Sequence, residues 1–331
     1  MGRSEFINQH NVSKQPLSIS NLGRSIKDDL TKLGVSIIHG FPMDGFDLYN
    51  ELAQLIITKP MTYTGGNNSR EDIGAGALSV GTEPPEVDVA AHNEMSYWYQ
   101  YPEVIMFGCK QSPNGRGPTV IANNYEVTKD ILSTTMGQKF KTLGVKYIRN
   151  FYDQNAKEEC RNRPSLRSWQ DAFSCESKTE MTKICQDKQW DYQFSTNDDL
   201  TIAYKMRAFE FDPALNENLF FVTIGCHGCS FDHWAPFNKL ENGQRPYHIT
   251  FGDDTELTSE DIVIFQKILD KHSIPIFWET GKILVLDNRR YTHARPPFRP
   301  DPDKPRVIGV KIGNPVDRSG IQPSTPFFSQ K

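Results

Sequence analysis

Two histidines and one glutamate in this chain have the types and spacing of a metal site. His92 and Glu94 lie two positions apart, and in a strand or extended loop residues i and i+2 point to the same side. His293 follows far downstream, after the polar run of residues 287–292. Two histidines and one carboxylate on one face of a metal ion are typical of non-haem Fe(II) oxygenases, where they leave positions open for a co-substrate and O2. The spacing alone also fits ordinary core histidines.

The predicted elements that must position these residues are mixed. Apolar and alternating runs predict strands at residues 35–39, 104–107, 119–122, 219–224, 283–286 and 306–312. Helical spacing and caps predict helices at 21–35, 44–58 and 259–271, and residues 125–200 are mainly helical and polar in pattern. This order predicts a β-rich α+β fold, with a jelly-roll (double-stranded β-helix) core, flanking helices and a helical insert at about 125–200. No Gly-rich strand-turn-helix unit is present to support a Rossmann core.

Length and composition bound the domain organisation. The chain has 331 residues, of which 37% are hydrophobic and 11% aromatic, which is enough apolar mass for a sizeable core. Residues 1–20 are polar and aperiodic, so we expect a loosely ordered N-terminal arm followed by a single jelly-roll oxygenase domain over 21–331.

Charge and targeting signals exclude several classes of partner. The net charge is −4, which argues against the basic surface that nucleic acid requires. No apolar run approaches the ~20 residues of a membrane span, and the first residues show no secretory signal. Six cysteines in this length are read as reduced thiols, so the prediction is a cytoplasmic protein with no membrane partner. The oligomeric state is left open.

Several blocks of the chain resemble one enzyme family in the same order. The segment His92-Asn93-Glu94-Met95-Ser96-Tyr97 resembles the metal-binding motif of the Fe(II)/2-oxoglutarate-dependent dioxygenases of the taurine dioxygenase and clavaminate synthase-like superfamily. Further matching blocks lie at residues 105–109, 115–119, 144–150, 168–173, 277–288 and 293–298. They extend over most of the chain, from about residue 60 to residue 312.

The resemblance implies a role for each matching position. His92, Glu94 and His293 would bind iron and form the catalytic centre. Thr119 would hydrogen-bond 2-oxoglutarate, and Arg306 would hold its distal carboxylate, because a guanidinium fork suits a carboxylate bidentately. The implied cofactors are Fe(II), 2-oxoglutarate and O2. Oxidative decarboxylation of 2-oxoglutarate to succinate and CO2 would drive attack on an unactivated C–H bond.

Two departures from the family pattern bear on these roles. The family's Gly-Gly-x-Thr turn is here Gly115-Arg116-Gly117-Pro118-Thr119. Some members carry a second arginine four residues after the anchor, and here that position is Val310, which leaves open how the keto-acid end of 2-oxoglutarate is held. Some related halogenases lack the carboxylate ligand, and the presence of Glu94 disfavours halogenation.

The substrate-binding residues are predicted from their places beside the motif. Arg70, in a loop that precedes the first ligands, could pair with a substrate carboxylate, or be a solvated loop cation. Arg295 could point inward or brace its loop, and Tyr97 could wall the pocket or belong to the core. Asn93, between two ligands, projects away from them and is read as structural. The resemblance implies an amino-acid-like small molecule, with hydroxylation, desaturation or oxidative ring closure, as in kainoid-type natural-product biosynthesis.

Other readings stay open at this point. Cys226 and Cys229, with His233 nearby, fit a zinc site, a redox pair or plain loop thiols, and plain thiols are favoured. The whole chain could instead be a non-catalytic jelly-roll small-molecule binding protein, or a zinc hydrolase using the same three ligands. Intact His92, Glu94, His293 and Arg306 argue against a binding protein.

Overall fold

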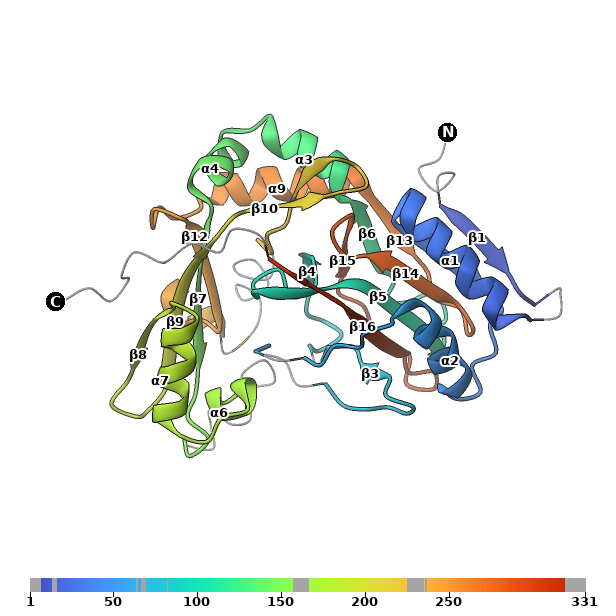
Figure 1. Ribbon diagram of the computed structural model, residues 1–331, viewed down its shortest axis with the longest axis horizontal. Helices are drawn as coiled ribbons and strands as arrows, with labels where there is room; N and C mark the ends of the chain where they lie inside the picture. Colours follow the sequence, from blue (N-terminus) through green and yellow to red (C-terminus); the bar gives the residue numbers. More distant parts are fainter. Residues whose placement is uncertain are drawn as a thin grey trace.

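The computed structural model describes residues 7–13, 17–63, 65–66, 70–81, 83–156, 167–224, 235 and 237–318. Its largest sheet has six strands in the order β1-β2-β14-β5-β16-β3 (Figure 1). In that order the strands are β1 (Asn8–Asn11), β2 (Val35–His39), β14 (Ile283–Asp287), β5 (Gln100–Gln111), β16 (Val307–Asp317) and β3 (Leu78–Ser79). All pairs in this sheet are antiparallel except β1 with β2.

A second, four-stranded sheet completes the jelly roll. Its order is β13 (Ser273–Ile276), β6 (Thr119–Asn123), β15 (Tyr291–Arg295) and β4 (Val89–His92), and every pair is antiparallel. From β3 to β6 and again from β13 to β16, consecutive strands of the chain alternate between the two sheets, so β14 of the first sheet is followed by β15 of the second. The predicted jelly-roll core is therefore confirmed.

The central strands of the large sheet are buried on both faces. On β14, Leu284 and Leu286 pack into the interior cluster, whereas Ile283 and Val285 pack outward. Successive side chains of a strand point to opposite faces, and both faces here meet apolar neighbours. This is why the strand reads as a continuous apolar run rather than as an alternating pattern.

Helices cover the outer face of the large sheet. Helix α1 (Ile19–Leu33) and helix α2 (Asp47–Ile56) share a core cluster with the outward residues of β14 and β5. Helix α1 begins at the N-cap Ser18, whose side chain accepts from the Asn21 N–H, and ends at Gly34, which has φ +75°. Only glycine adopts this conformation without strain. The remaining helices near the second sheet are α3 (Asn124–Leu132), α4 (Thr135–Leu143) and α9 (Ser259–His272).

The insert contains more helix than strand, as predicted, but the sequence pattern missed its strands. It contributes three strands to a third sheet, whose order is β12 (Tyr247–Phe251), β7 (Val145–Phe151), β9 (Leu200–Met206) and β8 (Asp191–Phe194). Helices α6 (Trp169–Phe173) and α7 (Lys178–Asp187) lie beside it (Figure 1). We call this sheet with α6 and α7 the insert module. The sequence pattern missed β7 because Lys146 and Arg149 are charged residues, and yet both are buried.

The first 20 residues are also more ordered than predicted wherever the structure describes them. Strand β1 pairs in parallel with β2, and α1 begins before residue 20. The polar side chains of Asn8 and His10 both hydrogen-bond the buried carboxylate of Asp29, at 2.6 Å each. A polar segment can thus be held in place without apolar periodicity, and this is why the sequence pattern missed it.

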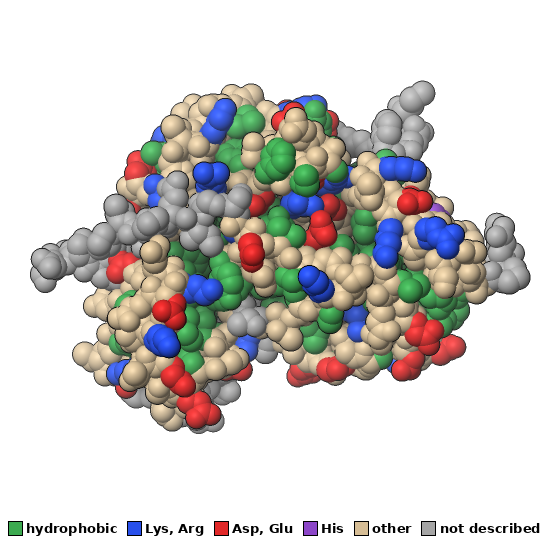
Figure 2. Space-filling model, in the orientation of Figure 1, with side chains coloured by type: hydrophobic (Ala, Val, Ile, Leu, Met, Phe, Trp, Pro, Cys, Tyr) green, Lys and Arg blue, Asp and Glu red, His purple; other side chains and the backbone are tan. Residues whose placement is uncertain are grey.

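Smaller elements complete the chain. The predicted strand 219–224 is shorter and earlier, as β11 (Glu217–Phe220), which pairs with β10 (Phe209–Asp212); Phe221, Val222 and Ile224 are buried without strand pairing. Two short 3-10 helices are Phe237–Lys239 and Asn242–Gln244. Among the described residues no helix is long and apolar enough to cross a membrane. On the face in Figure 2, acidic and basic side chains are interspersed.

Candidate metal centre and its surroundings

His92 and His293 face each other across two paired strands of the second sheet. They are direct register partners between β4 and β15, and their ring centroids lie 4.2 Å apart. The Nδ1 of His92 lies 2.8 Å from the carbonyl oxygen of Ala90. This contact makes Nδ1 the protonated nitrogen, so the lone pair of Nε2 is free to bind a metal.

Glu94 brings the carboxylate to the same place. It follows β4 by two residues, and its Oε2 lies 3.8 Å from the Nε2 of His293. One ligand atom from each of His92, Glu94 and His293 lies within 4.8 Å of the others. Among the residues that the structure describes, this is the single group of three or more His, Cys, Asp or Glu side chains that could hold a metal ion.

The main chain of Glu94 is fixed by one amide side chain. The Oδ1 of Asn288 accepts from the N–H of Glu94 at 2.7 Å, and its Nδ2 donates to the Glu94 carbonyl at 2.9 Å. Asn93 points away from the ligands, as predicted, and donates to the carbonyl of Asn288. The two ligand-bearing segments are thereby joined by side-chain amides on both sides of Glu94.

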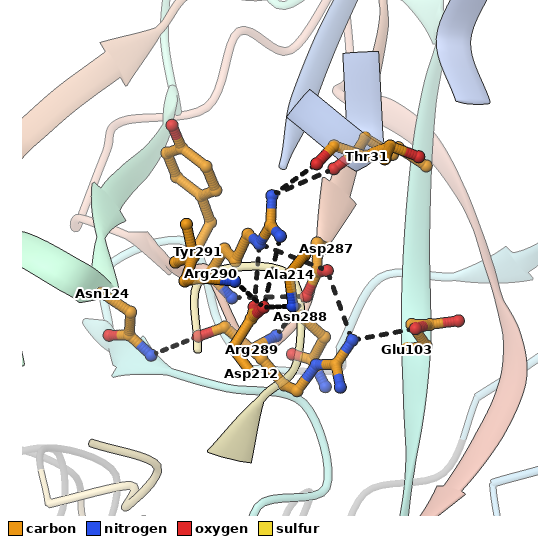
Figure 3. Close-up of polar contacts among 12 residues, drawn as sticks. Thr31, Glu103, Asn124, Asp212, Ala214, Asp287, Asn288, Arg289, Arg290 and Tyr291 are labelled. Atoms are coloured by element: carbon orange, nitrogen blue, oxygen red, sulfur yellow. Dashed lines mark hydrogen bonds and ion pairs between the residues drawn. The ribbon is translucent and has the colours of Figure 1, made fainter. Parts of the chain in front are cut away.

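Asn288 belongs to the turn that joins β14 to β15, which we call the connecting turn (residues 287–290). Figure 3 shows how it is held. The guanidinium of Arg290 donates to both oxygens of Asp212, at 2.8 and 3.2 Å, and to the carbonyl of Thr31 at the end of α1. Arg289 pairs with Glu103 at 2.9 Å. The strand that carries His293 therefore starts from a turn tied to three other parts of the fold.

Protonation states at the three candidate ligands suit a cation. Burial, and for His92 also the neighbouring His293, lowers the pKa of both imidazoles to about 3. Both rings are thus neutral, as metal ligation requires. Burial also raises the pKa of Glu94 to about 8, so its anionic form needs a compensating positive charge. A divalent ion would supply it, and the donor set fits Fe(II).

Comparison with known proteins gives the family. The model of the family described as taurine catabolism dioxygenase TauD, TfdA family matches residues 7–310. The chain belongs to this family. It is an Fe(II)- and 2-oxoglutarate-dependent dioxygenase, and its cofactors are Fe(II), 2-oxoglutarate and O2. The reading as a non-catalytic binding protein and the reading as a zinc hydrolase are therefore set aside.

Individual relatives are distant but match over most of their length. The dapdiamide synthesis protein DdaC of Enterobacter agglomerans is 23% identical over 298 residues, covering 88% of this chain and 85% of the relative. The solved structure of PvcB from Pseudomonas aeruginosa has a TM-score of 0.55 at 11% identity, covering 97% of this chain and 92% of that one. An asparagine oxygenase, solved with Fe(II), hydroxyasparagine and succinate, has a TM-score of 0.51 at 12% identity and covers 89% and 79%. The structural matches support the fold.

Thr119 and Arg306 of the dioxygenase lie together beside the three ligands. In the pairing of β6 with β15, Ile121 lies opposite His293, and Thr119 two residues earlier faces the same side. The Oγ1 of Thr119 accepts from the Nε1 of Trp278 at 3.1 Å and from Nη2 of Arg306 at 3.4 Å. Among the described residues, Arg306 forms no ion pair with a carboxylate. Burial and the nearby Arg295 lower its pKa to about 10, which leaves it charged at neutral pH.

Arg70 contacts the carboxylate of Glu94. Its Nη2 donates to Oε2 of Glu94 at 3.1 Å, and its Cζ lies 3.8 Å from the ring centroid of Tyr63. The side chain is only 11% exposed, so the reading of Arg70 as a solvated loop cation is wrong. The Nε of Arg70 is buried without a hydrogen-bond partner among the described residues.

The other two predicted substrate residues differ in their contacts. The ring of Tyr97 is partly buried, 5.4 Å from that of Tyr247. Arg295 donates four hydrogen bonds, of 2.9 to 3.2 Å, to the carbonyls of Glu83, Pro84, Pro85 and Val87. Of the two roles considered for Arg295, these bonds fit the brace of the loop before β4.

Sequence reasoning missed two groups that shape the site. Asn288 and Trp278 lie within a block that resembles the family, but the resemblance predicts no role for them. Asn288 lies in a polar run that reads as an ordinary solvated turn, so no pattern singles it out. The proposed sites at Cys226 and Cys229 lie outside the described residues.

Proposed function

We propose that this dioxygenase oxidises an unactivated C–H bond of an amino-acid-like small molecule, with hydroxylation, desaturation or oxidative ring closure as the outcome. Two relatives support the substrate class: the asparagine oxygenase by its name, and DdaC through the synthesis pathway in its name. The observation that carries the proposal is the convergence of one atom each from His92, Glu94 and His293 within 4.8 Å.

In this proposal the three converging side chains hold Fe(II), and the ion supplies the O2-activating chemistry when 2-oxoglutarate is bound. The chain's own residues orient the reactants. Thr119 and Arg306 receive the distal carboxylate of 2-oxoglutarate, because Arg306 offers a guanidinium with no described anionic partner next to a hydroxyl. The hydrogen bonds of Arg295 fix the loop before β4, and with it the start of the strand that ends at His92.

We assign Arg70 to a carboxylate of the substrate. Glu94 shares its negative charge with the ion once the ion is bound, and Arg306 is neutralised by 2-oxoglutarate. Arg70 then shares its described carboxylate partner, Glu94, with the metal ion, and a buried charge needs a partner. A substrate with a free carboxylate supplies one, whereas a thioester or an amide does not. Tyr63 and Tyr97 supply aromatic walls that exclude water at this end.

The first experiment tests iron and 2-oxoglutarate binding without any substrate. Fe(II) and then 2-oxoglutarate are added to the protein anaerobically, and we expect a visible metal-to-ligand absorption band. Zn(II) in place of Fe(II) is the control and should give no band. Absence of the band with Fe(II) would contradict the assigned ligands.

The second experiment tests the substrate class. Succinate release is measured over the common L-amino acids and their N-substituted derivatives, and the fastest compound is compared with its carboxamide. We expect the parent protein to prefer the free acid by at least about tenfold, since charge-assisted hydrogen bonds to a guanidinium are worth roughly 1.5–3 kcal/mol. In Arg70→Met this preference should disappear. An unchanged preference in that variant would remove Arg70 from the substrate site.

A further inference from the structure

The insert module forms hydrogen bonds with one residue of the loop that carries Arg70, which is Gly65. The N–H of Gly65 donates to the carbonyl of Ala172 in α6 at 2.7 Å. The carbonyl of Gly65 accepts from the Nη2 of Arg149 in β7. Both main-chain groups of this loop residue are therefore bound by elements outside the jelly roll.

Arg149 is rigidly placed for this contact. Its side chain is fully buried, and its Cζ lies 4.6 Å from the ring centroid of Tyr97, 4.9 Å from that of Phe151 and 5.0 Å from that of Tyr247. Aromatic faces attract a guanidinium and leave it few alternative positions. One of these rings, Tyr97, belongs to the segment directly after the ligand Glu94.

Gly65 can make these close contacts because it has no side chain. Its φ is +72°, and a Cβ there would lie 2.4 Å from Cη2 of Trp98. The backbone at residue 65 is consequently packed against the indole ring as well as hydrogen-bonded on both sides. A larger residue would force the loop away from Trp98.

Gly65 is close in the chain to Tyr63 and Arg70, and Arg70 contacts Glu94. Tyr63 lies two positions before Gly65, and the guanidinium of Arg70 stacks on the Tyr63 ring while donating to Glu94. Arg149 thus hydrogen-bonds Gly65, and Tyr63, two positions before Gly65 in the chain, contacts Arg70.

We infer that Arg149 is a positioning residue for substrate recognition, and that the insert module sets the place of Arg70 through Gly65. The inference rests on the proposed function of Arg70. It gives the insert module a specific task, which is to hold the substrate-binding loop while the jelly roll holds the iron ligands.

The test uses Arg149→Met in the full chain, with Lys146→Met as the matched control. Lys146 is also a buried cation of β7, but it pairs with Asp254 at 2.6 Å. We expect amide hydrogen exchange at Gly65 to rise at least about tenfold in Arg149→Met only, because the loop opens locally. This measurement needs no substrate. Unchanged exchange at Gly65 would overturn the inference even if the enzyme assay succeeds.

The kinetic arm uses the fastest amino acid from the succinate screen. In Arg149→Met its KM should rise about 10- to 100-fold, the scale of a small misplacement of a binding group, with the Fe(II)–2-oxoglutarate band unchanged. In an Arg70→Met background the same change should add little, since its effect passes through Arg70. Additive effects, or loss of the absorption band, would overturn the inference.

A second variant covers the case in which Arg149→Met does not fold. Gly65→Ala disturbs the same contacts from the loop side and should raise KM for that amino acid with the absorption band intact; an unchanged KM would contradict the inference. If no compound in the screen is turned over, the proposed substrate class fails, while exchange at Gly65 still decides whether Arg149 holds the loop.

Discussion

The connecting turn binds the main chain of Glu94, whereas Arg70 binds its carboxylate, and the segments that carry these two contacts are held by different means. The connecting turn is held by hydrogen bonds between the side-chain amide of Asn288 and the main chain of Glu94, and by a buried bidentate ion pair between Arg290 and Asp212. The loop of Arg70 is held by stacking of Arg70 on the Tyr63 ring and by two hydrogen bonds at the main chain of Gly65, one of them from the Arg149 guanidinium. The proposed iron ligands are thus fixed by the fold itself, whereas the proposed substrate contact of Arg70 depends on a few replaceable residues.

The largest effect is expected from removing a proposed iron ligand on the strand that follows the connecting turn. His293→Ala should lower succinate formation by about 1,000-fold or more, because metal-ion catalysis contributes several kcal/mol. The fold should persist, since the connecting turn keeps its other contacts. Circular dichroism checks the fold, and bound iron is measured after desalting. Succinate release at the parental rate would show that His293 is no ligand.

Removing the ion pair that holds the connecting turn should cost stability. Asp212→Asn removes the carboxylate that Arg290 binds bidentately and leaves it only the longer carboxylate contact, to Asp287 at 3.9 Å, so the free energy of unfolding should fall by about 3–5 kcal/mol. Urea denaturation measures this. A fall below about 1 kcal/mol would mean that the ion pair is not what holds the turn.

The same variant gives a pH prediction. Burial alone would raise the pKa of Asp212, but hydrogen bonds from Arg290 and the Leu215 N–H outweigh it, so the pKa lies below the usual 3.8. A lowered pKa in the folded state means that the contribution is fully present above the unfolded pKa and is lost as pH falls. The stability gap between parent and Asp212→Asn should therefore be constant from pH 7 to about pH 5 and shrink below about pH 4.

Asn288→Ala should loosen the proposed ligand Glu94 without removing it. The variant loses the amide that fixes both main-chain groups of Glu94. We expect iron affinity to fall about 10- to 100-fold, as is typical when a group that orients a metal ligand is lost. An anaerobic Fe(II) titration measures it, with Asn114→Ala at an exposed turn as the control. Unchanged affinity would mean that Glu94 is positioned without Asn288.

The smallest expected effect concerns the co-substrate. Arg306→Lys keeps the charge but loses the planar fork, so the KM for 2-oxoglutarate should rise about tenfold. Iron binding should be unchanged, because Arg306 contacts Thr119 and Gly117 and none of the three ligands. An unchanged KM would take Arg306 out of the co-substrate site.

Much of the jelly roll could be predicted from local pattern. The runs at 283–286 and 119–122 are apolar and β-rich, and both are strands of the core. The strands of the insert were missed because burial of Lys146 and Arg149 cannot be read from residue type. Lys146 pairs with Asp254, which is distant in sequence. Arg149 lies against the rings of Tyr97 and Tyr247, also distant, as well as against that of Phe151.

The sequence by itself determined the chemistry of the centre, because imidazole and carboxylate side chains at His92, Glu94 and His293 carry their ligand character wherever they lie. Only the tertiary structure decided which polar residues serve that centre. Asn288, Arg149 and Arg295 are alike in sequence in being polar residues near a motif, yet one fixes a ligand, one grips a loop and one braces a strand. These tasks depend on hydrogen-bond partners tens to hundreds of residues away, and such pairings exist only once the sheets have formed.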